Sequence, residues 1–152
     1  MTASEAPGRL ICYIDGASRG NPGRSAIGVV FYGPAGEHSE PLLEWGAGLG
    51  CATNNVAEYQ ALLSALGKAV EMGIRSLIVR SDSELLVRQM TGRYRVRQPH
   101  LQVLFGQAKQ LEAAIGRVSY EHVPRTKNVR ADGLANEALD AQRASTDGGA
   151  RA

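Results

Sequence analysis

Residues 10–23 read LICYIDGASRGNPG, and the rest of the chain is organised around this stretch. An apolar run, Leu10 to Ile14, delivers one carboxylate, Asp15, directly before a turn rich in Gly, Asn and Pro. A carboxylate at the end of a strand, beside exposed backbone, suits metal and phosphate chemistry. Asp-Gly pairs also close ordinary hairpins, so these residues alone favour a plain turn. Residues elsewhere in the chain are needed to distinguish a plain turn from a metal or phosphate site.

The length and composition indicate one soluble globular domain. The chain has 152 residues, of which 43% are hydrophobic and 21% charged, enough to bury a sizeable core. No apolar run approaches the ~20 residues of a membrane span. Residues 1–8 lack a basic segment followed by an apolar one, so the sequence predicts no signal peptide and a cytoplasmic protein.

Charge gives only a local hint of a nucleic-acid partner. The net charge of +2 is close to neutral. Four arginines nevertheless fall in one short window: Arg88, Arg93, Arg95 and Arg97. Arginine suits bidentate phosphate contacts, and a solvated surface explains such a cluster equally well, so both interpretations stay open.

The two cysteines, Cys12 and Cys51, fit no zinc pattern. A cytosolic chain normally keeps its thiols reduced, and nothing in the sequence requires a disulfide. Cys12 lies in an apolar strand, where we expect a small buried side chain.

The hydrophobic periodicity predicts the order β-β-β-α-β-α-α-β-α. The expected strands cover residues 9–15, 26–32, 37–49, 76–80 and 117–123, and the expected helices cover 53–72, 84–91, 99–114 and 129–142. Three strands joined by short turns form an antiparallel meander, and a strand after a helix adds a parallel crossover. The sequence thus predicts an α/β fold with a five-stranded mixed sheet and packed helices. It forms one domain over residues 9–140, with a loose N-terminus, 1–8, and a flexible C-terminal tail, 141–152.

Four carboxylates lie at the ends of these elements in apolar or small-residue settings. Asp15 ends the first strand, Glu58 lies in the first turns of the first helix, Asp82 follows the fourth strand, and Asp132 begins the last helix. Sites in α/β sheets collect where strand ends meet helix starts. If the four converge, their mutual repulsion raises some of their pKa values, and a divalent cation relieves it. Hard oxygen ligands suit Mg²⁺ or Mn²⁺ rather than zinc.

Amide side chains accompany the acids. Thr53, Asn54 and Asn55 precede Glu58 at the helix start, and Asn21 lies in the glycine-rich turn. Amides donate and accept hydrogen bonds, and the N–H groups of a helix's first turn attract phosphate. One of these residues is expected to cap the helix. Two consecutive asparagines exceed what a cap requires.

These motifs together resemble type 1 ribonuclease H. The resemblance rests on residues 15–23, DGASRGNPG; residues 53–58, TNNVAE; residues 81–83, SDS; and the Ala131-Asp132 pair. It covers about residues 9–140 in the family's order of elements. The resemblance implies the ribonuclease H-like fold, with helices on both faces of the sheet. It also implies an endonuclease that cuts the RNA strand of an RNA/DNA hybrid, leaving 5′-phosphate and 3′-hydroxyl ends.

The resemblance also assigns roles to single residues. Asp15, Glu58, Asp82 and Asp132 match the metal-binding carboxylates, which imply two Mg²⁺ ions about 4 Å apart, with Mn²⁺ as an alternative. Further residues match substrate-contact positions: Ser18, Asn21, Asn54 and Asn55, with Thr53 in a pocket for a phosphate of the DNA strand. The expected partner is the hybrid, and the expected state is a monomer.

Two departures from the family matter. Many members carry an extra helix and a Lys-rich handle, for which the interval from Gly92 to Pro99 is too short, so we expect weaker hybrid affinity and a steep salt dependence. The family also places a His in the loop before the last catalytic Asp. Here His122 belongs to the preceding strand, with a structural role, and Arg125 is the loop residue best placed to reach the phosphate. We therefore count Arg125 among the catalytic candidates.

This loop resembles an archaeal-like branch of the family, some of whose members accept double-stranded RNA. Double-stranded RNA is therefore an alternative substrate. A non-catalytic hybrid-binding module is a further alternative, although the presence of all four carboxylates argues against it. An integrase or resolvase on the same fold is disfavoured by the Thr-Asn-Asn and Gly-Asn-Pro-Gly segments.

Overall fold

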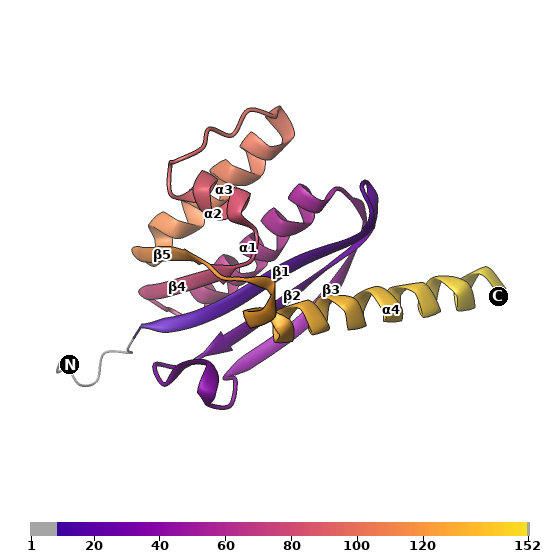
Figure 1. Ribbon diagram of the computed structural model, residues 1–152, viewed down its shortest axis with the longest axis horizontal. Helices are drawn as coiled ribbons and strands as arrows, with labels where there is room; N and C mark the ends of the chain where they lie inside the picture. The colour runs from indigo at the N-terminus through magenta and orange to yellow at the C-terminus, as the bar shows by residue number, and fades with distance from the viewer. Residues whose placement is uncertain (1–8, 152) are drawn as a thin grey trace.

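The computed structural model describes residues 9–151, with side chains as far as residue 141. The predicted loose N-terminus, 1–8, lies outside this range. Five strands form one sheet in the order β3-β2-β1-β4-β5 (Figure 1). The strands are β1 (Leu10–Gly20), β2 (Gly23–Tyr32), β3 (Leu43–Ala52), β4 (Ser76–Ser81) and β5 (Arg117–His122). β1, β2 and β3 pair antiparallel, whereas β4 pairs parallel with both β1 and β5. The predicted mixed sheet is confirmed.

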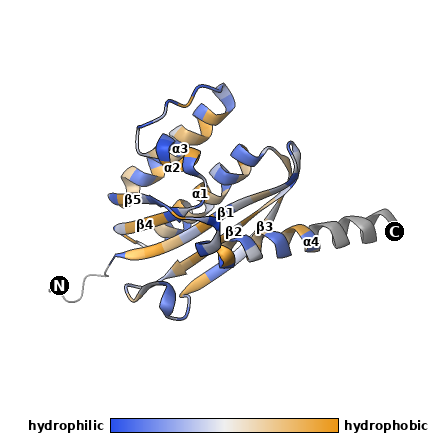
Figure 2. Ribbon diagram, viewed as in Figure 1, coloured by the Kyte–Doolittle hydropathy of each residue, from blue (hydrophilic) through white to orange (hydrophobic). Residues whose placement is uncertain are grey.

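Helices cover both faces of this sheet, as expected. They are α1 (Asn54–Glu71), α2 (Glu84–Met90), α3 (Pro99–Ile115) and α4 (Val129–Arg151), with short 3₁₀ turns η2 (Gly36–His38) and η3 (Arg125–Lys127). α1 packs against the sheet and α3 packs on α1, while α4 crosses the opposite face over β2 and β3 (Figure 1). The strands are hydrophobic over much of their length, whereas the helices also carry hydrophilic residues, as elements with one buried side do (Figure 2).

The first hairpin differs from the prediction. β1 does not end at Asp15 but continues to Gly20, pairing with β2 until the chain turns at Asn21 and Pro22. Asp15 therefore lies within the strand, opposite Gly28. The Asp-Gly turn signal is overridden because an uninterrupted ladder satisfies the backbone polar groups of the small residues that follow.

Two further boundaries differ. The third strand begins at Leu43 rather than Glu37, because Gly36–His38 form a 3₁₀ turn first. α4 continues to Arg151 instead of ending near Gln142, so the backbone is helical over most of the segment predicted as a flexible tail. Residues 141–144 read AQRA, which are strong helix formers without a proline to stop the helix.

The hydrophobic core is divided by the sheet. The larger cluster lies on the α1 and α3 side and includes Tyr59, Leu62 and Leu66, all of them at most 1% exposed. The smaller cluster lies under α4. Cys12 is buried and Cys51 exposed, and both are free thiols. None of the helices over the described residues is long and apolar enough to cross a membrane.

Candidate active site

The strand pairing brings Asp15 and Asp82 together. β1 and β4 run parallel, and their ladder ends at the pair Ile14 and Ser81. The next residue on each chain is an aspartate. Since both strands point in the same direction, the two carboxylates meet at the same edge of the ladder. This geometry, rather than a strand end at Asp15, explains the convergence that the sequence predicted.

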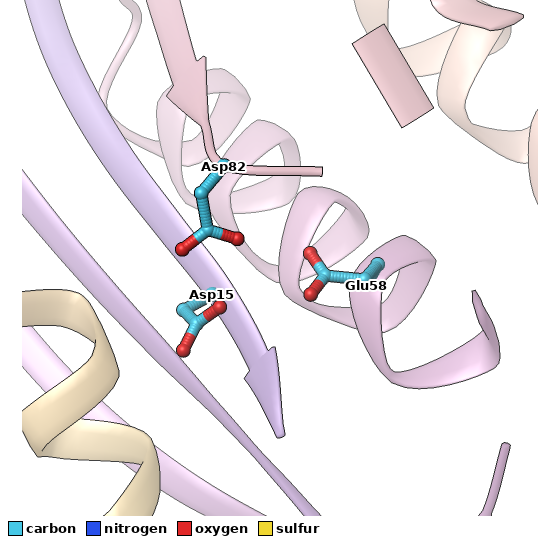
Figure 3. A group of neighbouring side chains, drawn as sticks. All are labelled: Asp15, Glu58 and Asp82. Atoms are coloured by element: carbon cyan, nitrogen blue, oxygen red, sulfur yellow. The ribbon is translucent and has the colours of Figure 1, made fainter. Parts of the chain in front are cut away.

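Gly16 brings Glu58 to the same point. A Cβ atom at Gly16 would overlap the backbone of Ala57 and Glu58, so only glycine lets the start of α1 approach β1 this closely. The Gly16 backbone also lowers the pKa of the Glu58 carboxyl group, although burial outweighs this effect. As a result, carboxylate oxygens of Asp15, Glu58 and Asp82 lie within 4.8 Å of one another and point toward a common centre (Figure 3).

Asp132 approaches from the other face of the sheet. Gly28, the register partner of Asp15, leaves room for α4, because a Cβ atom there would overlap the carbonyl oxygen of Ala131. Asp132 lines the same cavity as the other three acids. It does not belong to the group whose oxygens lie within 4.8 Å. The four predicted carboxylates are therefore arranged as a tight trio and a fourth acid, Asp132, whose side chain reaches Asp15 and raises its pKa.

The trio is electrostatically strained. Burial, followed by the charges of Glu58 and Asp82 and by the neighbouring Asp132 side chain, raises the pKa of Asp15 to about 9. Burial and the charge of Asp82 raise the pKa of Glu58 to about 8, against the opposing effects of the Gly16 N–H and Arg125. The buried Glu58 Oε2 has no hydrogen-bond partner among the described residues. A cluster of carboxylates in which one buried oxygen lacks a donor is a ligand set that fits a hard divalent cation.

An open cavity of about 480 Å³ surrounds the acids, and its remaining lining is polar. Asn54 and Asn55 line it, together with Ser18, Ser83 and Asn136. The Thr53 side chain caps α1 by accepting a hydrogen bond from the Val56 N–H at 3.2 Å. Because Thr53 supplies the cap, both asparagine side chains remain exposed and available to a ligand.

The other predicted substrate contacts lie beside this cavity. Asn21, at the hairpin tip, accepts a hydrogen bond from the Asn54 backbone N–H at 3.1 Å. Ser18 contacts the Ser25 hydroxyl at 3.0 Å and the Ala52 carbonyl at 3.1 Å. Neither Asn21 nor Thr53 lines the cavity itself. The hydrogen bonds fix the hairpin against the start of α1 and extend the polar surface away from the acids.

The structure separates the two candidates for the loop position. Arg125, in η3, lines the cavity that holds the carboxylates. His122 is the last residue of β5 and lines a different hollow, beside α2. This placement agrees with the predicted assignment of His122 to the strand.

Asn128 is a residue of the site that was not among the predicted site residues. Its side chain is 1% exposed, and its Nδ2 donates to the Ile14 carbonyl at 2.8 Å and to Asp82 Oδ2 at 3.1 Å. Its backbone carbonyl accepts the Asp132 N–H at 3.0 Å. One residue thus contacts β1, an acid of the trio and the first turn of α4. The available signal was an asparagine four residues before Asp132, directly ahead of a helix.

Known proteins are similar to this chain in sequence. Residues 13–138 match the reverse transcriptase-like family. The bifunctional protein Rv2228c of Mycobacterium tuberculosis is 44% identical over 88% of this chain and 36% of its own length. Ribonuclease HI of Halobacterium salinarum is 44% identical over 88% of this chain and 65% of its own. A ribonuclease H of Halorhodospira halophila is 31% identical over 90% of this chain and 97% of its own. The chain thus spans about a third of the mycobacterial relative and just under two thirds of the archaeal one.

Solved structures agree over nearly the whole fold. The N-terminal RNase H domain of the mycobacterial protein has a TM-score of 0.85 at 43% identity, covering 91% of this chain and 98% of that one. Halobacterium salinarum RNase H1 has a TM-score of 0.82 at 44% identity, with 88% and 99% covered. LC11-RNase H1, solved in complex with an RNA/DNA hybrid, has a TM-score of 0.82 at 42% identity, with 88% and 98% covered.

Proposed function

The chain belongs to the type 1 ribonuclease H family, and we propose that it is an endonuclease that hydrolyses the RNA strand of RNA/DNA hybrids. The observation that carries the proposal is the trio of carboxylates, whose oxygens lie within 4.8 Å of one another in a polar cavity. A binding module without catalysis would gain nothing from three acids held together at such an electrostatic cost.

The carboxylates are the proposed metal ligands. Asp15, Glu58 and Asp82 would hold divalent cations, with Asp132 contributing from α4. Two such ions, Mg²⁺ or Mn²⁺, supply an activated water and stabilise the leaving 3′ oxygen when they are bound. The chain's own contribution is to place the acids, and Gly16 and Asn128 fix the positions of Glu58 and Asp82.

Recognition is assigned to the amides at the start of α1. Asn54 and Asn55 are exposed and line the cavity, and Asn21 extends the same surface along the hairpin. Side chains of this kind read the 2′-hydroxyl and the groove edges of a duplex, which distinguish RNA from DNA at a given position. We expect little sequence preference, because these contacts recognise sugar and shape.

Arg125 is proposed to act on charge. Its side chain lines the cavity and lowers the pKa of Glu58, although burial and Asp82 outweigh that effect. A guanidinium does not take up a proton near neutral pH. Arg125 can therefore neutralise the scissile phosphate or assist release of the product, but it cannot serve as a general base.

A cleavage assay with three substrates tests the proposal. Labelled RNA/DNA hybrid, double-stranded RNA and duplex DNA are incubated with Mg²⁺, with Mn²⁺ and with EDTA. We expect cuts in the RNA strand of the hybrid, dependent on the metal, with 5′-phosphate and 3′-hydroxyl ends. Duplex DNA should stay intact.

The same assay contains its controls. Loss of cleavage in the Asp15→Asn protein excludes a contaminating nuclease. If the wild-type protein binds the hybrid and leaves it uncut with either metal, the chain is a binding module and the proposed activity is wrong. Cleavage of double-stranded RNA at a comparable rate would widen the substrate class to RNA strands in any A-form-like duplex.

A further inference from the structure

A second hollow lies beside the catalytic cavity and has no role in the proposed chemistry. This hollow, the α2 groove, has a volume of about 310 Å³ and lies between α2 and the end of β5. It is lined by Glu84, Val87, Arg88, Thr91, Arg93, Tyr120 and His122. The four helical members are spaced i, i+3, i+4 and i+7, so they form one face of α2. Tyr120 and His122 lie on one face of β5.

The α2 groove and the catalytic cavity share no lining residue, but consecutive residues of the chain line them. Ser83 lines the cavity and the next residue, Glu84, lines the groove. From Glu84 to Thr91 the helix advances about 10 Å at 1.5 Å per residue. One strand of a duplex rises about 3.4 Å per nucleotide. A strand with one phosphate at the carboxylates would therefore bring another, within about three nucleotides, to the far end of the groove.

That far end is positively charged. Gly92 has φ +80°, and the Arg93 N–H donates to the Arg88 carbonyl at 2.8 Å, which is the Schellman geometry of a helix end. This cap holds Arg93 next to Arg88. The Arg88 guanidinium also lies 5.2 Å from the centre of the Tyr94 ring, which limits its movement.

The near end is less positive. Glu84 pairs with Arg88 at 3.3 Å, and both side chains are partly exposed. Arg93 has no ion-pair partner among the described residues. The groove therefore carries a surplus of positive charge at the end away from the carboxylates, as a site for a single phosphate requires.

We propose that the α2 groove binds a backbone phosphate of the nucleic-acid substrate, within about three nucleotides of the cut, through Arg88 and Arg93. This assignment rests on the proposed function, because the substrate reaches the groove by passing the carboxylates. It also decides between a phosphate contact and a solvated surface, the two interpretations that the sequence left open for the four clustered arginines. Arg88 and Arg93 line the groove, whereas Arg95 and Arg97 lie outside it.

A matched pair of double variants tests the proposal. Arg88→Gln/Arg93→Gln and the control Arg95→Gln/Arg97→Gln remove the same charge from the same segment. Binding to a labelled hybrid is measured with Mg²⁺ in the Asp15→Asn background, which prevents cleavage, over a range of salt concentrations. We expect the groove variant to bind about tenfold more weakly at 0.1 M salt, with a salt slope reduced by about 1. The control should change less than threefold.

Neutral methylphosphonate linkages, placed one at a time in the hybrid, locate the contact. Protein with an intact groove should lose affinity at one position within about three nucleotides of the cut, and the groove variant should lose that sensitivity. Equal losses in both double variants would reduce the effect to unspecific charge and overturn the proposal. A wild-type protein that cleaves the hybrid while the groove variant binds normally would overturn this inference alone. Absence of both cleavage and binding in the wild type would overturn the proposed function as well.

Discussion

The two faces of the sheet hold their carboxylates differently. The α1 face rests on the large cluster, which includes the fully buried Leu62 and Leu66, and it contributes Glu58. The α4 face rests on a small cluster formed by Tyr13, Val30, Tyr32 and Ala131, and it contributes Asp132. α1 packs closely against Gly16 of β1, and α4 packs closely against Gly28 of β2. Neither glycine has space for a Cβ atom.

This difference separates a central trio of carboxylates from a fourth that comes from the opposite face. The trio belongs to β1, β4 and α1, whose positions are set by the main core. Dense packing there keeps the like charges together in spite of their repulsion. Asp132 lies outside the trio on a helix with fewer apolar partners beneath it. The trio is thus held by the main core, whereas Asp132 reaches Asp15 from the opposite face of the sheet.

The largest expected difference is in the cleavage rate, between a protein that lacks an acid of the trio and one that lacks Asp132. We expect Asp15→Asn to lower the cleavage rate at least about 1000-fold, because about 4 kcal/mol of transition-state stabilisation is lost with a central ligand. Asp132→Asn should lower it only about 10- to 100-fold. Single-turnover cleavage of a hybrid with Mg²⁺ measures both rates, and circular dichroism checks folding. Equal losses would contradict the division of the site into a central trio and an outer fourth acid.

The strained trio should make metal-free stability depend on pH. The pKa of Asp15 is raised from its ordinary 3.8 to about 9, so the folded protein holds a proton that the unfolded chain has lost. Stability is therefore full below about pH 4 and falls as the pH rises toward 9. In EDTA at pH 8 we expect Asp15→Asn to melt about 5 °C above the wild type, with a smaller gap at pH 5. Thermal unfolding measures the gap, which Mg²⁺ should close by stabilising only the wild type. No difference in EDTA would mean that the trio is not strained.

The two close-approach glycines compare the faces directly. Gly16→Ala and Gly28→Ala each force a Cβ atom into a helix backbone, and overpacking of this kind costs roughly 1–3 kcal/mol. We expect Gly16→Ala to lower Tm by about 5–8 °C and Gly28→Ala by about half as much. A Cβ atom at Gly16 would lie within 2.5 Å of three backbone atoms of α1, whereas at Gly28 only the Ala131 carbonyl oxygen is that close. Cleavage should fall further in Gly16→Ala, since Glu58 is displaced. Calorimetry and the cleavage assay are run on both proteins. A larger loss of Tm or of cleavage rate in Gly28→Ala than in Gly16→Ala would contradict this order.

Asn128 links the two faces, and its loss should uncouple them. We expect Asn128→Ala to lower kcat about 30-fold with little change in KM, because Asp82 and the start of α4 lose a shared hydrogen-bond partner. The concentration of Mg²⁺ needed for half-maximal activity should rise, and a merely structural role would leave it unchanged. Asn128→Ser, which retains a donor, serves as the conservative comparison. Unchanged Mg²⁺ dependence in a folded variant would show that Asn128 does not position the trio.

The smallest expected effect is the difference in kcat between the Arg125→Ala and His122→Ala proteins. Arg125→Ala should lower kcat about 3- to 10-fold, since its side chain faces the carboxylate cavity. His122→Ala should leave kcat near wild type and raise KM slightly, because His122 lines the α2 groove. Steady-state kinetics on one hybrid distinguish them. A fall in kcat confined to His122→Ala would reverse the assignment.

Local patterns predicted most elements because they are local in origin. The apolar spacing from Ala57 to Val70 and the cap at Thr53 define α1 without help from distant residues. The end of β1 was predicted wrongly, because pairing with β2 outweighs the turn preference of Asp15 and Gly16. The end of α4 was also missed, since the sequence beyond Gln142 carries neither a proline nor a clear apolar stripe to decide it.

The sequence by itself determined which residues could perform the chemistry: the four acids, the amides at the start of α1, and the glycines beside them. Only the tertiary structure decided how they divide. The parallel ladder that ends at Ile14 and Ser81 places Asp15 against Asp82, and Gly16 admits Glu58. It also revealed Asn128 as their common support and separated Arg88 and Arg93 from the arginines next to them. The physical reason is that distances between residues far apart in the chain depend on strand register and helix packing, which no local pattern records.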